Sequence, residues 1–321
     1  MPRRQPGSTV HPSYVTEQER DTPTLSIGLP VYNGEEFLGE SLNALLAQTY
    51  RDFELIISDN ASTDGTAEIC RAYAERDRRV RYVRQPVNIG AAPNHNALVL
   101  LARGRYFKWA SHDDLYAPTL LERCIEVLET DPEPVLVHAR DAIIDHHGEV
   151  VRTLPYPLDT ANPRPSARLR SLLYVPGGND FYGVIRAEVL RRIDLHGSYY
   201  NADRTIVASL CLQGPFHQVP EVLYFRRDHP DRASRASGRR ARAAVLDPKR
   251  ANRWRHPMIR MYAEYVLGYV KAIRQARLSV IQSGRCLAEV AGWLLSCLWP
   301  GRKRRSLESA NPMTTTPRAA T

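Results

Sequence analysis

Two adjacent carboxylates, Asp113 and Asp114, stand where the apolar run RYFKWA gives way to the segment SHDDLYAP. Carboxylate oxygens are ligands that hard divalent cations such as Mg²⁺ or Mn²⁺ accept. A cation held there can bridge to a diphosphate and, as a Lewis acid, stabilise the charge of a departing phosphate group. The plainer alternative is that the two acids only favour the start of a helix near residue 117, because carboxylates stabilise helix N-termini.

The acid pair follows the fourth of five strand-like runs, and helical patterns separate the runs. Each run is short and apolar, and the five cover residues 24–29, 53–58, 80–84, 105–110 and 134–144. This alternation predicts an α/β fold, in which a mainly parallel sheet is flanked by helices. Ligands of such folds bind at the carboxyl ends of the strands.

Three segments that can bind a ligand follow these strands, and a parallel sheet would place all three along one edge. They read PVYN, SDNASTDGT and SHDDLYAP. Tyr32 can stack on a nucleotide base, and Asp59 can accept a hydrogen bond from a base N–H. The alternatives are that Tyr32 is a core aromatic and that Asp59 only forms a turn, as we expect of Asp64.

Composition narrows the partners and the compartment. The chain of 321 residues has a net charge of +9, which suits an anionic ligand or surface without choosing between them. Five scattered cysteines without a C-x-x-C pair indicate neither a disulfide framework nor a zinc site. They favour a reducing, cytoplasmic location. No apolar run is long enough to span a bilayer, and the N-terminus does not read as a secretion signal.

The strand–helix rhythm breaks near residue 150, and five segments are expected. They are a disordered leader, a catalytic domain, a basic linker, a C-terminal helical segment and a disordered basic tail, at residues 1–22, 23–230, 231–257, 258–300 and 301–321. The basic stretch 232–260 contains one aromatic residue, Trp254. It does not predict a nucleic-acid platform, which needs interleaved aromatic rings.

The C-terminal helical segment ends in CLAEVAGWLLSCLW, which RKRR follows after a short gap. An apolar run flanked by cations suits peripheral binding at a membrane surface, here the inner face of the cell membrane. The alternative is a helix that packs on its own domain or on a partner subunit of a homo-oligomer.

Two stretches resemble the family 2 inverting glycosyltransferases, which have the GT-A fold. They are LSIGLPVYNGEEFLGESLNALLAQTYRDFELIISDNASTDGT and NIGAAPNHNALVLLARGRYFKWASHDDLYAP, and the resemblance covers about residues 24–230. It implies inverting, metal-dependent transfer of a sugar from a nucleotide-diphosphate sugar, with a UDP-sugar favoured, to an acceptor hydroxyl. The QxxRW signature of processive synthases is absent, so transfer of a single sugar is expected. The acceptor would be a saccharide or lipid-linked, in cell-envelope glycan or glycolipid assembly.

The resemblance also assigns roles to the donor-site residues. The residues that it places around the nucleotide and donor sugar are Pro30, Tyr32, Asn33, Asp59, Asn88, Gly90 and Asp113. Among them, Asp59 would contact the base, typically uracil, and Asp113 would face the ribose and the sugar. Asp114 would ligate Mg²⁺ or Mn²⁺, and His229 would meet the metal or the diphosphate. Arg226 and Arg227 could also face phosphate.

The catalytic base implied by the resemblance is Asp203, in the segment NADRTIVASL. It would take the proton of the acceptor hydroxyl during an in-line displacement. The alternatives are that Asp203 is only a helix N-terminal acid and that His229 is a surface histidine. Ser58 and Ala202 stand where the family often has acids. A nucleotidyltransferase, a dehydrogenase or a P-loop enzyme would need a glycine-rich motif that PVYNGEE does not supply. The remaining rival is a non-catalytic nucleotide-sugar-binding or assembly protein of the same fold.

Overall fold

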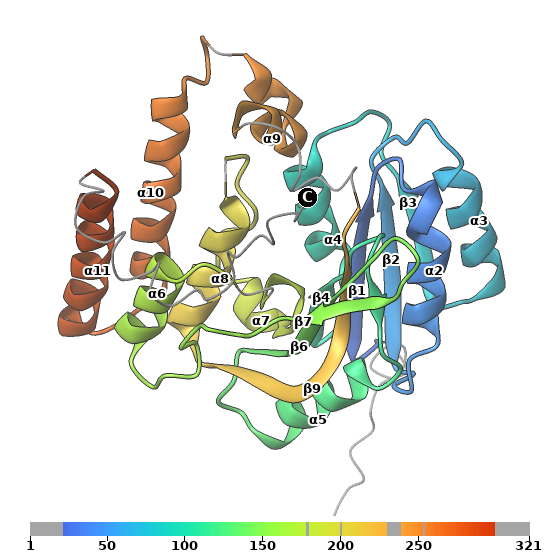
Figure 1. The fold of residues 1–321 in the computed structure, drawn as a ribbon, viewed down its shortest axis with the longest axis horizontal. Helices are drawn as coiled ribbons and strands as arrows, with labels where there is room; N and C mark the ends of the chain where they lie inside the picture. The colour runs from blue at the N-terminus through green and yellow to red at the C-terminus, as the bar shows by residue number, and fades with distance from the viewer. Residues whose placement is uncertain (1–21, 178–179, 200, 230–238, 253, 299–321) are drawn as a thin grey trace, which may run out of the picture.

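The computed structural model describes residues 22–177, 180–199, 201–229, 239–252 and 254–298. These residues form a mixed sheet with helices on both faces, and helices from the second half of the chain gather at one end of it (Figure 1). The expected tail and all of the expected leader except Thr22 lie outside the described residues.

The first half of the sheet is the predicted parallel unit. Its strands lie in the order β3 (Val80–Arg84), β2 (Phe53–Asp59), β1 (Leu25–Val31) and β4 (Tyr106–Trp109), and all run in one direction. β2 is buried along its whole length and β1 along nearly all of it. Helices cover both faces of such a sheet, which explains the continuous apolar runs in the sequence. The predicted α/β fold class is confirmed.

Three helices connect these strands: α2 (Glu35–Leu46), α3 (Thr66–Arg76) and α4 (Ala91–Leu101). A fourth helix, α5 (Leu120–Thr130), leads into the second half of the sheet. Two hydrophobic clusters result, because successive side chains of a strand point to opposite faces. One contains leucines of α2 and α5 with alternate residues of β1, and the other contains residues of α4 with Phe107 and Trp109 of β4.

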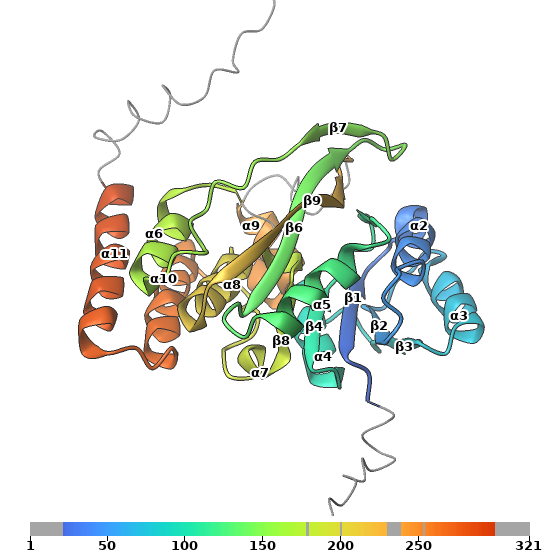
Figure 2. The same cartoon turned by 90° about the horizontal axis from the view of Figure 1, so that it is seen from below.

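The second half of the sheet is mixed. β8 (Val184–Arg186) runs antiparallel to β4 and to β6 (Leu136–Ile144), whereas β9 (Phe216–Arg227) runs parallel to β6. At the far edge the short β5 (Leu115–Tyr116) pairs antiparallel with β9, and β7 (Val150–Thr153) pairs with the end of β6. Figure 2 shows β6 and β9 running through the middle of the view toward β7.

The pairing of β5 with β9 brings late residues to the acid pair. Its register sets Leu115 opposite Phe225 and Tyr116 opposite Tyr224. Because β5 begins directly after Asp114, the end of β9 lies beside the two acids.

The helices of the second half pack on one another at the end of the sheet. α10 packs against α8, and α11 packs against α6 and α10. Tyr265 and Tyr269 of α10 meet Trp293 of α11 edge-on. The bounds of these elements are α6 (Pro165–Tyr174), η1 (Asp180–Tyr182), α7 (Ala187–Leu190), α8 (Ala202–Gln213), α10 (Met258–Gln275) and α11 (Val280–Leu298).

The helical segment expected over residues 258–300 is therefore two helices that fold back on each other (Figure 1). The chain turns between them at Arg277, whose φ of 49° is left-handed and ends a helix. The range 231–257, expected to be a linker, contains α9 (Arg239–Leu246) and η3 (Pro248–Ala251). The arginine-rich sequence of this segment did not indicate that it would pack against α4.

Candidate active site

Hydrogen bonds join the loops that follow β1 and β2 at the carboxyl edge of the sheet. The Asn33 N–H donates to Ser62 Oγ (3.0 Å), and the Thr63 N–H donates to Asn33 Oδ1 (2.9 Å). The loop after β4 also reaches this point, since a Cβ added to Gly34 would lie 2.6 Å from a ring carbon of His112. The structure thus brings together the three segments that sequence analysis placed along one edge.

Pro30, Tyr32 and Asn33 lie at the mouth of this edge. Pro30 is half-buried at the end of β1, opposite Ser58. Tyr32 is 45% exposed, so its ring lies outside the core. Asn33 has a left-handed φ of 50°, a conformation that asparagine tolerates better than most residues.

Asp59 is fully buried and bonded to other parts of the chain. Its Oδ1 accepts from the Ser62 N–H (2.8 Å), and its Oδ2 accepts from Tyr82 (2.8 Å) and from Arg84 Nη1 (2.8 Å). Asp59 and Arg84 end neighbouring parallel strands in register. Burial raises the pKa of Tyr82 to about 12, so its hydroxyl stays a donor to Asp59. A base that met Asp59 would therefore also meet Arg84, which sequence analysis did not single out.

Asn88 and Gly90 form a turn that is bonded to the loop after β2. Asn60 Nδ2 donates to Asn88 Oδ1 (3.0 Å), and the Gly90 N–H donates to the same oxygen (2.9 Å). Gly90 has φ +92°, and a Cβ there would lie 2.6 Å from the Leu246 carbonyl oxygen. The segment between α9 and η3 therefore rests on this turn, at the N-terminus of α4.

The two acids of the pair have different surroundings. Asp114 is fully buried; its Oδ1 accepts from the Arg227 N–H (2.9 Å), and its Oδ2 accepts from the Tyr224 hydroxyl. Asp113 is 5% exposed. Its Oδ1 accepts from the Ser111 hydroxyl, and its Oδ2 lies 3.0 Å from His229 Nε2. The structure thus brings His229 to Asp113 and sets Asp114 deeper.

The acids do not cap the following helix. α5 begins at Leu120, its N-cap residue is Thr119, and β5 separates that helix from the acid pair. The helix-start alternative therefore does not account for Asp113 and Asp114.

Arg227 faces the protein interior, not the open edge where phosphate was expected. Its side chain is fully buried. Its Nε donates to the Asp113 carbonyl (3.0 Å) and its Nη1 to the His146 carbonyl (2.6 Å), while the guanidinium lies 4.6 Å over the Phe37 ring. His229 packs 4.9 Å from the same ring. These contacts fix the end of β9 against the acid pair.

The surroundings of the two ring nitrogens of His229 bear on whether a metal can bind here. Its Nε2 faces Asp113, and its Nδ1 is buried without a hydrogen-bond partner in the described chain. A histidine that binds a metal commonly donates its second ring N–H to a carboxylate. Within the described ranges no group of three or more His, Cys, Asp or Glu could hold an ion. The donors present therefore fit a cation that takes its remaining ligands from phosphate and water, as Mg²⁺ does.

Asp203 is exposed in the first turn of α8, after Asn201 with φ 58°. It lies near His196. Burial lowers the pKa of His196, and the charge of Asp203 offsets only part of this shift. Asn96 of α4 holds the His196 backbone from both sides, at 2.8 Å and 2.9 Å. The His95 ring lies 5.7 Å away, and burial lowers the pKa of His95 to about 3. Asp203 thus lies near the His196 imidazole, which the sequence did not mark.

The arrangement of the sheet and its helices is the GT-A fold. The structure of S. aureus TarS 1–349 in complex with UDP-GlcNAc superposes with a TM-score of 0.53 at 14% identity, over 88% of this chain and 93% of that one. The mannosyltransferase PcManGT of Pyrobaculum calidifontis, in complex with GDP-Man and Mn²⁺, gives 0.50 at 18% identity, over 90% and 79%. At these identities the likeness shows the fold alone.

The chain belongs to glycosyl transferase family 2, whose model matches residues 26–193. An uncharacterized glycosyltransferase of Rickettsia typhi is 35% identical over 130 residues, which are 40% of each chain. Glycosyltransferase GlyG of Streptococcus pneumoniae is 34% identical over 113 residues, 35% of this chain and 38% of GlyG. The matches thus cover about two fifths of these relatives. No helix in the described part of the chain has the length and apolarity to cross a membrane.

Proposed function

We propose that this glycosyltransferase is inverting and metal-dependent, and that it moves a single sugar from a nucleotide-diphosphate sugar to an acceptor hydroxyl. The observation that carries the proposal is the buried acid pair at the carboxyl edge of the sheet, with His229 Nδ1 unpartnered beside it in the described chain. UDP is the favoured nucleotide. Support comes from the motif resemblance and from the UDP-GlcNAc bound by TarS, while the GDP-Man of PcManGT keeps GDP as the competing choice.

Asp114 and His229 would hold Mg²⁺ or Mn²⁺, and Asp113 would face the ribose and the donor sugar. Each carboxylate oxygen has two lone pairs, so the bonds from Tyr224, Arg227 and Ser111 do not exhaust them. The cation, when bound, supplies positive charge to the diphosphate as it departs. The chain's own part is to fix these ligands before the donor arrives.

Asp203 would act as the general base. It takes the proton of the acceptor hydroxyl, the acceptor oxygen forms a bond to the anomeric carbon, and the bond from that carbon to the diphosphate breaks. The displacement inverts the anomeric configuration. Exposure suits this role, because the acceptor must reach the carboxylate from solvent.

Turnover is tested with UDP-, GDP- and dTDP-sugars in the presence of Mn²⁺, by following release of the nucleotide diphosphate. We expect release from one donor class, loss of release with EDTA and recovery when Mn²⁺ is added back. Proton NMR of the product should show an inverted anomeric centre. Binding of a nucleotide sugar without any release would instead support the non-catalytic alternative.

We also propose that the outer face of α11 binds an anionic membrane surface, where the acceptor is lipid-linked. The face carries Val280, Ile281, Leu287 and Leu295, all exposed, although the inner face of α11 packs on the protein. The sequence continues into RKRR, and cations next to an apolar helix face favour anionic lipid.

The membrane proposal is tested by flotation with vesicles that contain anionic lipid. Truncation before α10 is unsuitable, because it removes Tyr265 and Tyr269 from the core. Leu287→Glu with Leu295→Glu is expected to abolish flotation of the full chain. Equal flotation of the double variant contradicts the proposal. Absence of flotation together with dimerisation that the double variant loses would assign the face to a homo-oligomer.

A further inference from the structure

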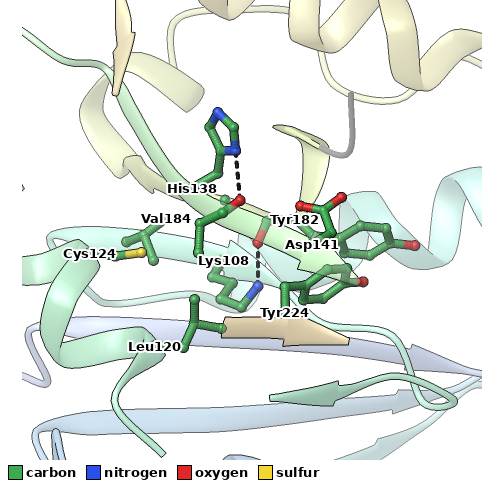
Figure 3. Close-up of a pocket in the computed structure, with 10 residues that line it drawn as sticks. Lys108, Leu120, Cys124, His138, Asp141, Tyr182, Val184 and Tyr224 are labelled. Carbon is green, nitrogen blue, oxygen red and sulfur yellow. Dashed lines mark hydrogen bonds between the residues drawn. The ribbon is translucent and has the colours of Figure 1, made fainter. Parts of the chain in front are cut away.

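Lys108 is a buried lysine in the middle of the sheet. It lies on β4, is 1% exposed, and lines a cavity of about 10 Å³ together with Leu120 and Cys124 of α5 (Figure 3). An ammonium group without compensation would be costly in such surroundings. The surroundings must therefore stabilise the charge.

Two kinds of contact provide this compensation. Lys108 Nζ donates a hydrogen bond to the Tyr182 carbonyl (Figure 3). The same nitrogen lies 5.3 Å from the centre of the Tyr116 ring and 5.4 Å from that of Tyr224. Both distances lie within the range of cation–π attraction, which strengthens when the cation is desolvated.

The hydroxyls of these two rings hold the two ends of the turn that carries the acid pair. Tyr116 accepts from the Ser111 N–H (2.9 Å) and donates to the Ser111 carbonyl (2.9 Å). Tyr224 donates to Asp114 Oδ2. The rings face each other across the β5–β9 pair, with centroids 5.6 Å apart. One ammonium therefore contacts both residues that fix residues 111 and 114.

We propose that Lys108 is a positioning residue for the acid pair, acting through the Tyr116 and Tyr224 rings. Its charge attracts both ring faces and so keeps their hydroxyls directed at Ser111 and Asp114. A neutral side chain of the same length would fill the space without this attraction. The importance of this arrangement for donor binding rests on the proposed function, whereas the arrangement itself does not.

The charge persists near neutral pH. Burial lowers the pKa of Lys108 to about 8, against the opposing effects of Cys124, Asp114 and Asp141. Most Lys108 side chains are therefore protonated at pH 7.

The test is a double-mutant cycle of Lys108→Met and Tyr224→Phe, read as the Kd for UDP in the presence of Mn²⁺. We expect each single variant to weaken binding on the order of tenfold, and the double variant to lose less than the product of the two single losses. Cys124→Ala is the matched control, because it alters the same cavity wall without touching the charge, and its Kd should match that of the wild type. If the two single losses of affinity simply multiply in the double variant, the two residues act independently and the proposal is wrong.

Lys108→Arg keeps the charge and serves if Lys108→Met does not fold. Its Kd should stay within about threefold of the wild type, and a loss as large as that of Tyr224→Phe would count against a role for the charge.

Hydrogen exchange separates this inference from the proposed function. In Lys108→Met, amides of residues 111–116 should exchange faster than in Cys124→Ala, while β1 and β2 exchange as in the wild type. A wild type that binds no nucleotide would refute the proposed function and leave this readout valid. Unchanged exchange at residues 111–116 would refute the positioning role.

Discussion

The backbone amide of Arg227 donates to Asp114 Oδ1 at 2.9 Å, and the side chain of the same residue donates to the backbone carbonyl of Asp113 at 3.0 Å. A single residue at the end of β9 thus fixes both acids of the pair. The guanidinium is fully buried, so this arrangement is part of the core and not a mobile ligand contact.

Arg227→Met should lower the free energy of unfolding by about 3 kcal/mol, because it leaves the Asp113 and His146 carbonyls and the Glu40 carboxylate without their donor. It should also weaken metal-dependent nucleotide binding. Urea unfolding measures the first effect. Arg192→Met is the control, since that side chain is 68% exposed and its pairing with Glu188 should be worth less than about 0.5 kcal/mol. Equal stability of the two variants would contradict the assignment.

Gly90→Ala should displace the segment between α9 and η3 from the turn that Asn88 and Gly90 form. The added Cβ would strain a φ of +92° and meet the Leu246 carbonyl oxygen at 2.6 Å. We expect a loss of about 1–2 kcal/mol and faster proteolysis within residues 239–251. Gly284→Ala in α11 meets nothing within 4 Å and should instead gain up to about 1 kcal/mol. Unchanged cleavage in Gly90→Ala would mean that the segment does not depend on this contact.

Asp180 should make stability fall as the pH rises. Burial raises the pKa of Asp180 to about 7, although a hydrogen bond from Tyr156 opposes it. Between about pH 4 and 7 the folded state holds a proton that the unfolded chain has released, so raising the pH through this window destabilises the fold. Asp180→Asn should be more stable than the wild type by about 2 kcal/mol at pH 8, with a smaller difference at pH 5. Unfolding curves that differ equally at both pH values would contradict this.

Asp203→Asn should lower kcat on the order of 100-fold or more and leave the donor Kd unchanged, because the amide cannot accept the acceptor's proton. The side chain is exposed, so stability should not change. Steady-state kinetics with calorimetric donor binding separate these effects. Asp194→Asn, which alters only a surface pair with Lys271, is the control. Wild-type turnover in Asp203→Asn would move the base to another residue.

The sequence predicts the parallel half of the sheet because local signals suffice there. Each strand of that half is a continuous apolar run, and polar segments such as SDNASTDGT mark where the strands end. The meeting of the loops at Asn33, Ser62 and His112 follows from parallel order alone.

The surroundings of the acid pair depend on pairings that no local pattern records. β5 has two residues, and β9 reaches it only after a register shift against β6. Tyr224 therefore looked like an ordinary strand residue, Arg227 like a residue that faces phosphate, and Lys108 like an exception in an apolar run. The turn at Arg277 was likewise hidden inside a continuous helical pattern.

The central claim is that the acid pair holds a metal against a nucleotide diphosphate, and calorimetric titration tests it most directly. UDP, GDP and dTDP would be titrated with and without Mn²⁺ into the wild type, Asp114→Ala and the control Glu68→Ala, whose carboxylate is exposed on α3. The account predicts metal-dependent binding of one nucleotide that Glu68→Ala keeps and Asp114→Ala loses. Absence of metal-dependent binding by any nucleotide, or equal binding by Asp114→Ala, would contradict it.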